Sequence, residues 1–224
     1  MKNDEIVLQK IKNMEVFESP TDIQRDTLLS LQSAPLMTYK AYRDLIDKNH
    51  LENKVTGHEQ SQELLQYSQL NAQRMTRWDK HYIPSEAIQD TLPQLPANWH
   101  VVVIAEGWCG DAAQIIPAIQ KIAALGRDWK FSIALRDENP IWMNLFLTNG
   151  AKAIPIAVVF DAMGHYIFHW GPRPKLAIEL INNAKSMLVS AEVWKVELHK
   201  WYATNKQQAL ELEWMELLTK YKTT

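Results

Sequence analysis

The residues most suited to chemistry lie in the segment Glu106-Gly107-Trp108-Cys109-Gly110-Asp111-Ala112, which contains the only cysteine of the chain. An apolar run over residues 101–105 precedes it and predicts a strand buried on both faces of a parallel or mixed sheet. Apolar residues at helical spacing follow from Ile115, so Cys109 is expected at the start of a helix. Trp-Cys-Gly at such a strand-to-helix junction predicts a thiol that is exposed and reactive, not buried as a small hydrophobic side chain.

Charges close to the thiol would decide its pKa. The unpaired N–H groups and positive dipole end of a helix N-terminus lower the pKa of a thiol placed there. The carboxylates of Glu106 and Asp111 would oppose that shift if they lie close, whereas Arg74, Arg77 or Arg173 would support it. The fold decides which of these side chains reach the sulfur.

The order of elements after the first strand predicts the fold that positions the thiol. Asn139 followed by Pro140 is typical of an N-cap and the first position of a short helix. Further signals predict a second strand at 129–135, a third at 153–161, a turn at 161–164, a fourth strand at 165–170 and a helix from about 175 to 188. The order strand, helix, strand, helix, strand, strand, helix predicts an α/β fold with a mixed central sheet and helices on both faces.

Trp108, Cys109 and Gly110 resemble the active-site motif of the thioredoxin superfamily, Trp-Cys-Gly-x-Cys, with Ala112 at the position of the second cysteine. The resemblance implies a thioredoxin-like core, extended by N-terminal and C-terminal helices. In the two-cysteine motif the first thiolate attacks a disulfide and the second cysteine releases the product. Alanine cannot do this and the chain has no other cysteine, so an outside thiol such as glutathione would have to complete the cycle.

A wider stretch of the chain is similar to a bacterial thioredoxin-family group that carries a helical region before the core. The matching segments are 61–77, which includes Tyr67, Asn71, Arg74 and Arg77, then 135–139, 147–150, 154–155, 170–174 and 201–203. The similarity spans roughly residues 37–218. In thioredoxins a cis-proline loop packs beside the thiol and pairs with an extended substrate, which implies that Ile154 and Pro155 line the site here.

Cys109 is therefore the candidate catalytic residue. The candidate substrate-contacting residues are Trp108, Gly110, Asp111, Ala112, Ile154 and Pro155. Structural roles are the alternatives: Trp108 can be a packing residue, and the proline can simply begin a strand. Asn71, Arg74 and Arg77 are typical of a solvated helix face, and the resemblance adds the hypothesis that one of them borders the thiol.

Two main classes of function fit these residues. In the first, a monothiol oxidoreductase, Cys109 attacks a disulfide or a glutathionylated cysteine, so the partners are protein or small-molecule thiols and disulfides. The second is a non-catalytic binding module that keeps the thioredoxin groove but has lost turnover with Ala112. A third, ranked below both, is an iron–sulfur cluster held with glutathione between two subunits, as in monothiol glutaredoxins. No resident cofactor or metal is expected, and glutathione is a candidate co-substrate.

Composition indicates a compact protein without nucleic-acid or membrane partners. Of the 224 residues, 46% are hydrophobic, which is enough for a sizeable core. The formal net charge of −2 provides no basic footprint for nucleic acid or an anionic membrane. Residues 1–20 lack the apolar segment of a secretory signal and no run approaches membrane-spanning length, so we expect a cytoplasmic location.

The chain divides into four predicted regions. Residues 1–36 are polar and form an N-terminal extension, and residues 37–98 form a helical region packed on the core, with a long helix over 61–78. Residues 99–190 form the thioredoxin-like domain. Residues 191–224 form C-terminal helices whose apolar faces are expected to pack on the core.

Overall fold

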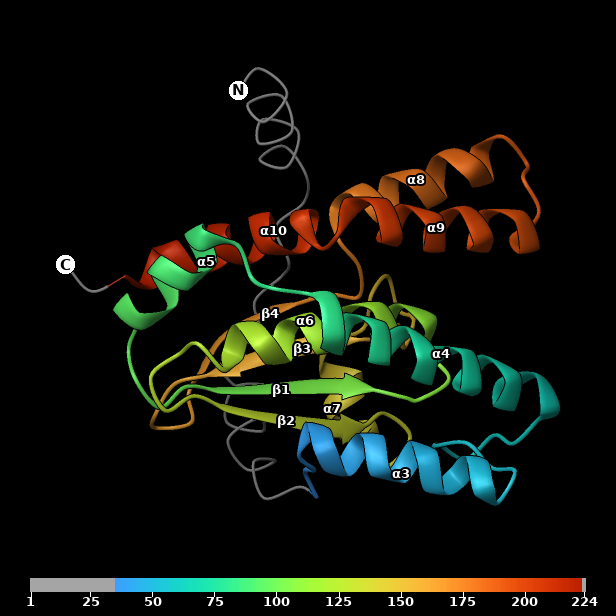
Figure 1. Cartoon of the computed structure of the whole chain (residues 1–224), viewed down its shortest axis with the longest axis horizontal. Helices are drawn as coiled ribbons and strands as arrows, with labels where there is room; N and C mark the ends of the chain where they lie inside the picture. Colours follow the sequence, from blue (N-terminus) through green and yellow to red (C-terminus); the bar gives the residue numbers. More distant parts are fainter. Residues whose placement is uncertain (1–34, 223–224) are drawn as a thin grey trace.

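The computed structural model describes residues 35–222, and its centre is one mixed sheet (Figure 1). The strands are β1 (His100–Ala105), β2 (Lys130–Leu135), β3 (Ile156–Phe160) and β4 (Tyr166–Trp170). Their order in the sheet is β2–β1–β3–β4, with β1 parallel to β2, β1 antiparallel to β3 and β3 antiparallel to β4. The predicted mixed sheet and the predicted order of strands and helices along the chain are therefore confirmed.

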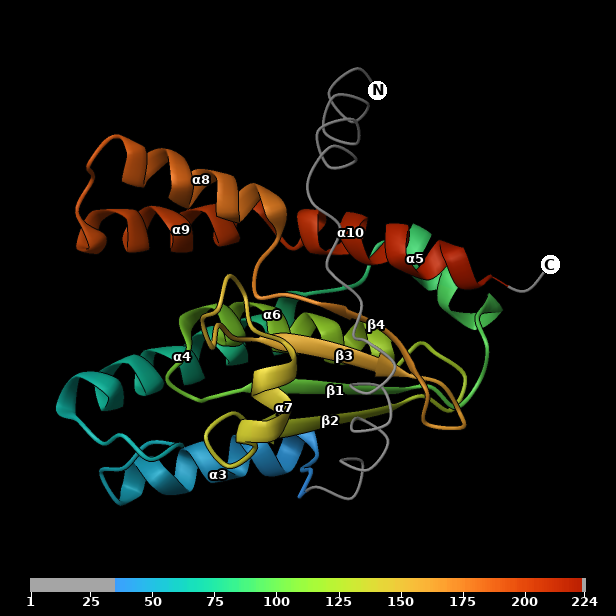
Figure 2. The same cartoon turned by 180° about the vertical axis from the view of Figure 1, so that it is seen from behind.

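Helices cover both faces of this sheet. They are α3 (Tyr39–Leu51), α4 (Gln62–His81), α5 (Glu86–Thr91), α6 (Gly110–Ala123), α7 (Pro140–Leu145), α8 (Lys175–Ser186), α9 (Ala191–Asn205) and α10 (Gln208–Leu218), with short 3₁₀ turns η2 (Leu92–Gln94) and η3 (Thr219–Tyr221). One face carries α6 with α4 packed against it, and the view from behind shows α7 on the other (Figure 2). The helices α8 and α9 form a hairpin that extends to one side of the sheet.

Burial on both faces holds β1 in place. Every residue from Val101 to Ala105 is fully buried, as the apolar run predicts. Full burial of a valine or isoleucine side chain contributes roughly 1.5–3 kcal/mol, so this strand is a large part of the core. Because side chains alternate between faces, a slip of one residue would move each of them to the opposite face.

The strand register brings several loops to one edge of the sheet, at the right of Figure 1. Ala105 at the end of β1 is paired with Leu135 at the end of β2. Ile104 lies opposite Ile156, the first residue of β3, and β4 ends at Trp170 beside the same strand. The loops 106–109, 136–139, 154–155 and 171–174 therefore meet at this edge. The peptide bonds before Pro155 and Pro172 in these loops are both cis.

Local capping explains where the predicted helices begin. The Ser61 hydroxyl accepts the backbone N–H of Leu64 at 3.1 Å, so α4 begins one residue later than predicted. Asn139 precedes α7 as predicted, but its side chain donates to the carbonyl of Leu135 at 2.8 Å and does not cap the helix. The position of Asn139 was therefore predicted correctly and its hydrogen bond was not.

The C-terminal helices only partly fulfil the expectation that their apolar faces pack on the core. Buried hydrophobic side chains on α9 and α10 are Leu198, Tyr202, Ala209, Leu210, Trp214 and Leu218. Val193 and Val196 of α9, by contrast, are each 53% exposed. The predicted N-terminal extension lies outside the described residues except for its last two. Within residues 35–222, no helix combines the length and apolar character needed to cross a membrane.

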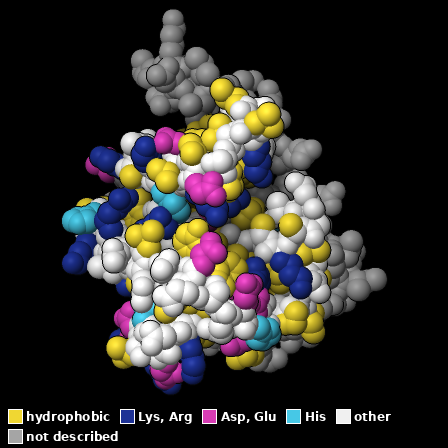
Figure 3. Space-filling view, turned by 90° about the vertical axis from the view of Figure 1, so that its right-hand side faces the viewer, with side chains coloured by type: hydrophobic (Ala, Val, Ile, Leu, Met, Phe, Trp, Pro, Cys, Tyr) yellow, Lys and Arg dark blue, Asp and Glu magenta, His cyan; other side chains and the backbone are white. Residues whose placement is uncertain are grey.

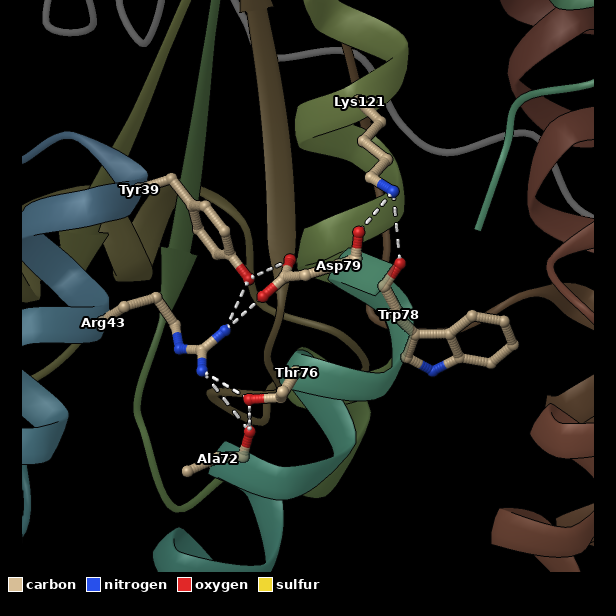
Figure 4. A network of polar contacts seen from close by, with 7 residues as sticks. All are labelled: Tyr39, Arg43, Ala72, Thr76, Trp78, Asp79 and Lys121. Atoms are coloured by element: carbon tan, nitrogen blue, oxygen red, sulfur yellow. Dashed lines mark hydrogen bonds and ion pairs between the residues drawn. The ribbon is translucent and has the colours of Figure 1, made fainter. Parts of the chain in front are cut away.

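A polar network joins α3 to the C-terminal half of α4 (Figure 4). Arg43 of α3 forms an ion pair with Asp79 and donates to the hydroxyl of Thr76 at 2.9 Å. The Tyr39 hydroxyl donates to the same Asp79 carboxylate at 2.9 Å. Burial raises the pKa of Tyr39, so its hydroxyl remains a donor at neutral pH. The network fixes α3 relative to α4.

Lys121 of α6 connects this network to the core helix (Figure 4). Its ammonium donates to the backbone carbonyls of Asp79 at 2.7 Å, Tyr82 at 2.6 Å and Trp78 at 3.4 Å. These carbonyls lie at the C-terminus of α4, where a cation also interacts favourably with the helix dipole.

We expect the Lys121→Met substitution to lower the free energy of unfolding by about 1–2 kcal/mol, because it removes the cation and three donated hydrogen bonds at one helix end. Denaturant unfolding measures the change. The matched control is Lys40→Met, which removes only an exposed ion pair with Asp44 and should cost less than about 1 kcal/mol. Equal losses in the two variants would contradict the role assigned to Lys121.

Candidate functional site

The loop between β1 and α6 is fixed by residues from the N-terminal helical region. The backbone N–H of Gly107 donates to the Thr56 hydroxyl at 2.8 Å, and the side chain of Asn71 on α4 donates to the Gly107 carbonyl at 3.0 Å. Asn71 is fully buried, so it borders the loop and does not lie on a solvated helix face. This contact places one residue of α4 against the loop that carries Cys109. That Asn71, Arg74 or Arg77 borders the thiol itself stays a prediction.

Trp108 is held in place on two sides. Its indole N–H donates to the carbonyl of Thr56 at 3.1 Å, and the Arg136 guanidinium lies over its ring at 4.7 Å from the centroid. Arg136 also forms an ion pair with Asp137 at 2.7 Å, as expected of a structural loop pair. Trp108 remains partly exposed, so it is neither a core residue nor free in solvent.

The Cys109 thiol lies between the first turn of α6 and the loop that precedes β3. Its sulfur accepts the backbone N–H of Ala112 at 3.4 Å, and its S–H donates to the Ile154 carbonyl at 3.3 Å. Cys109 is the N-cap residue of α6, as predicted. It is only 8% exposed, however, so the expectation of an exposed thiol is wrong.

The pKa of the Cys109 thiol is raised to about 12, mainly because burial removes solvent from the thiolate. The Asp111 carboxylate raises it further. Two influences oppose these: the N–H groups of Asp111 and Ala112, and the positive charge of Arg173. The expected lowering by the helix N-terminus is therefore present but smaller than the effect of desolvation.

Other charged side chains near the motif have partners of their own. The Glu106 carboxyl is fully buried and accepts the backbone N–H of Asp137 at 3.0 Å, and burial raises its pKa. Arg77 stacks over the ring of Trp78 at 4.6 Å from the centroid. Of the two carboxylates and three arginines considered from the sequence, Asp111 and Arg173 are the pair that acts on the thiol.

Asp111 links three parts of the chain at the site. Its buried carboxylate forms an ion pair with Arg173 at 2.6 Å and accepts the hydroxyl of Tyr202 at 2.8 Å. Arg173 lies in the loop after β4, and Tyr202 lies on α9. Burial and the neighbouring carboxylate raise the pKa of Tyr202, so it is a neutral donor. One side chain of the motif thus holds both the loop and the C-terminal helix.

The helix α9 covers the start of α6. A Cβ atom on Gly110 would lie 3.0 Å from His199 Cε1, so a larger residue there would require the histidine ring to shift. His199 Nδ1 lies 3.1 Å from the side-chain amide nitrogen of Gln114 on α6. The backbone carbonyl of Gln114 accepts the side-chain amide of Gln207 at 2.6 Å, and Gln207 lies just beyond the end of α9. Burial lowers the pKa of His199 to about 4, and so do Arg74 and Arg173.

The structure brings the candidate residues together at one edge of the sheet. Cys109, Gly110, Asp111 and Ala112 form the first turn of α6, and Ile154 reaches the sulfur through its carbonyl. Pro155 follows in the same buried loop. Four residues that contact the motif or its helix were not identified as site residues from the sequence: Thr56, Gln114, His199 and Tyr202. Only Tyr202 lies in a segment, 201–203, that the family resemblance had included. Seen from this edge, acidic and basic side chains are interspersed with hydrophobic ones (Figure 3).

Comparison with known proteins identifies the family. A family model described as thioredoxin matches residues 57–185, more than half of the chain. The chain belongs to the thioredoxin family. The match includes the cysteine motif, the cis-Pro155 loop and all four strands, so the thioredoxin-like fold expected from the motif is confirmed. It ends within α8, and α9 lies beyond it.

The thioredoxin-family chain is similar to two solved structures. One is an HIV epitope-scaffold, with a TM-score of 0.47 and 15% identity over 82% of this chain and 96% of that one. The other is a protein of unknown function from Pseudomonas aeruginosa, with a TM-score of 0.42 and 16% identity over 75% of this chain and 96% of that one. No curated protein matches the sequence. Within the described part of the chain, no cluster of three or more His, Cys, Asp or Glu residues is arranged to hold a metal ion.

The Asp111→Asn substitution should shift alkylation of Cys109 by iodoacetamide to lower pH, because it removes the carboxylate that raises the thiol pKa and leaves Arg173 in place. Each unit by which the pKa falls increases the thiolate fraction about tenfold at a pH below it. In the unmodified protein the rate should still be rising at alkaline pH, well above the ordinary thiol pKa of about 8.5.

Mass spectrometry of the labelled protein measures both profiles. Cys109→Ser serves as the blank, and Asp90→Asn on α5 serves as a charge-matched control with an exposed side chain. Thermal unfolding verifies that each variant is folded at the labelling temperature. Identical pH profiles for Asp111→Asn and the control would contradict the electrostatic role of Asp111.

Proposed function

We propose that the chain is a monothiol thiol–disulfide oxidoreductase in which Cys109 exchanges with a disulfide and an external thiol completes the cycle. The position of the sulfur supports this most directly. It lies between the Ala112 N–H, which stabilises a thiolate, and the Ile154 carbonyl on the cis-proline loop. A substrate that pairs with this loop would place its own sulfur beside Cys109.

The proposed exchange proceeds in two balanced steps. The Cys109 thiolate attacks one sulfur of a disulfide, which forms a mixed disulfide with Cys109 and expels the other half as a thiolate that takes up a proton. An external thiolate such as that of glutathione then attacks the substrate sulfur of this mixed disulfide. The products are a new disulfide and the Cys109 thiol, so the protein returns to its reduced state.

The second step has to use an external thiol. Ala112 lies where the second cysteine of a two-cysteine motif would be, and the chain has no other thiol. Burial of Cys109 and its raised pKa mean that the resting site holds a neutral thiol, which is a poor nucleophile. We infer slow exchange at neutral pH and a cytoplasmic location, where glutathione-type thiols keep cysteines reduced.

The same burial favours a second candidate function, a binding module without turnover. Ile154 is 6% exposed and Cys109 8%, so neither is open to a large substrate in this conformation. In such a module Trp108 and the loop before β3 would contact a partner while the sulfur stays protonated. The two candidates differ in whether Cys109 can form a mixed disulfide in the folded protein.

Incubation with oxidised glutathione tests the proposed function. We expect intact-mass spectrometry to show one glutathione adduct on the folded protein, absent from Cys109→Ser, that forms faster as the pH rises and is removed by reduced glutathione. Urea-denatured protein is the positive control for the thiol itself. An adduct on the denatured chain and none on the folded chain would reject monothiol exchange and favour the binding module.

The Ala112→Cys substitution tests whether the site lacks only a resolving thiol. We expect the variant to gain dithiol-dependent reduction of a protein disulfide such as insulin, because the new thiol would lie one helical turn from Cys109. Ala113→Cys, a buried neighbour at the next position, is the matched control. No gain in a folded Ala112→Cys protein, or an equal gain in the control, would contradict an otherwise intact redox site.

A further inference from the structure

Arg74 on α4 carries a positive charge beside the cysteine motif without an ion-pair partner among the described residues. It is partly buried, and its guanidinium donates to the amide oxygen of Asn71 at 2.8 Å. A Cβ atom on Gly110 would lie 3.5 Å from Arg74 Nη1, so the guanidinium lies next to the residue that follows Cys109. The neutral Asn71 amide positions Arg74 but does not balance its charge.

The other charged groups around Arg74 balance its charge only in part. Asp111 is the nearby carboxylate, and its oxygens are occupied by Arg173 and the hydroxyl of Tyr202. His199 on α9 feels both Arg74 and Arg173, and burial together with these two charges keeps its ring neutral above about pH 4. Burial lowers the pKa of Arg74; the charge of Asp111 opposes this, and repulsion by Arg77, one turn along α4, adds to it. Within the described residues, Asp111 therefore faces two arginines and is paired with one.

A partly desolvated guanidinium is stabilised by an anion that accepts two of its N–H groups, and a carboxylate fits this geometry best. We propose that Arg74 binds a carboxylate of a small thiol or disulfide substrate, so that the protein acts on anionic low-molecular-mass thiols of the glutathione type. The sulfur of such a molecule would then lie toward Cys109. The part of the proposal that makes this ligand a substrate rests on the proposed function.

The position of α9 against the first turn of α6 favours a small-molecule ligand over a protein. His199 lies against Gly110, and Tyr202 is bonded to Asp111, so α9 occupies the space beside the first turn of α6. Cys109 is nearly closed off, whereas Arg74, Gly110 and Arg173 remain partly exposed. A tripeptide-sized anion can reach the exposed guanidinium while α9 stays in place.

Titration of the full chain with S-methylglutathione, followed by nuclear magnetic resonance, tests the proposal without any redox step. We expect binding to the unmodified protein, weaker binding of the dimethyl ester of the same compound, and an affinity about ten- to hundredfold lower for Arg74→Gln. Arg77→Gln removes the same charge from the same helix and should bind nearly as well as the unmodified protein. Arg74→Lys, which keeps the charge but not the paired donors, should lie between them.

Three outcomes would overturn the proposal: no binding by the unmodified protein, equal binding of the acid and its ester, or equal affinities for folded Arg74→Gln and Arg77→Gln. The result is separable from the test of exchange, because S-methylglutathione cannot form a disulfide. Binding that depends on Arg74 together with no glutathione adduct on Cys109 would reject the oxidoreductase and leave the anion site in place. An adduct together with any of these three outcomes would reject the anion site and leave the oxidoreductase in place.

Discussion

The buried central strand β1 is the constraint on which the rest of the structure depends. Because its side chains are buried on both faces, its register with β2 and β3 cannot change by one residue without reversing the whole pattern. That register brings the end of β1, the start of β3 and the end of β4 to one edge. Cys109, Ile154 and Arg173 meet there although they are far apart in the sequence. The site is therefore a consequence of strand pairing.

Asp111 determines how the segments outside the sheet are arranged around that edge. Its carboxylate is buried and needs compensation, which Arg173 and the Tyr202 hydroxyl supply from the loop after β4 and from α9. The contact with Tyr202 brings α9 over the first turn of α6, where His199 lies against Gly110. The same carboxylate raises the pKa of the thiol beside it. Asp111 thus contributes both to the position of α9 and, after burial, to the raised pKa of the thiol.

The sequence predicted the order of strands and helices because each depends on local signals: apolar runs, alternation, caps and turns. It also located Cys109 at the start of α6 and, through family resemblance, the loop of Ile154 beside it. Burial of the thiol was not predictable from local signals, because it depends on packing between distant segments, such as the loop of Ile154, 45 residues after Cys109. The hydrogen bond of Tyr202 to Asp111 joins residues 91 apart, and no periodicity along the chain indicates such a contact.

The charges around Cys109 connect the protonation state of its thiol to the charge of the ligand that the proposed site would bind. When Cys109 is ionised, the first turn of α6 carries two negative charges, on the sulfur and on Asp111, and Arg173 can neutralise only one of them. With the thiol protonated, Asp111 and Arg173 are matched and Arg74 remains in excess. An anionic ligand at Arg74 would therefore disfavour the thiolate electrostatically, so the attacking cysteine must gain its stabilisation from the N–H groups of α6. A substrate site of the proposed kind would gain selectivity for anions and lose rate of attack by the thiolate.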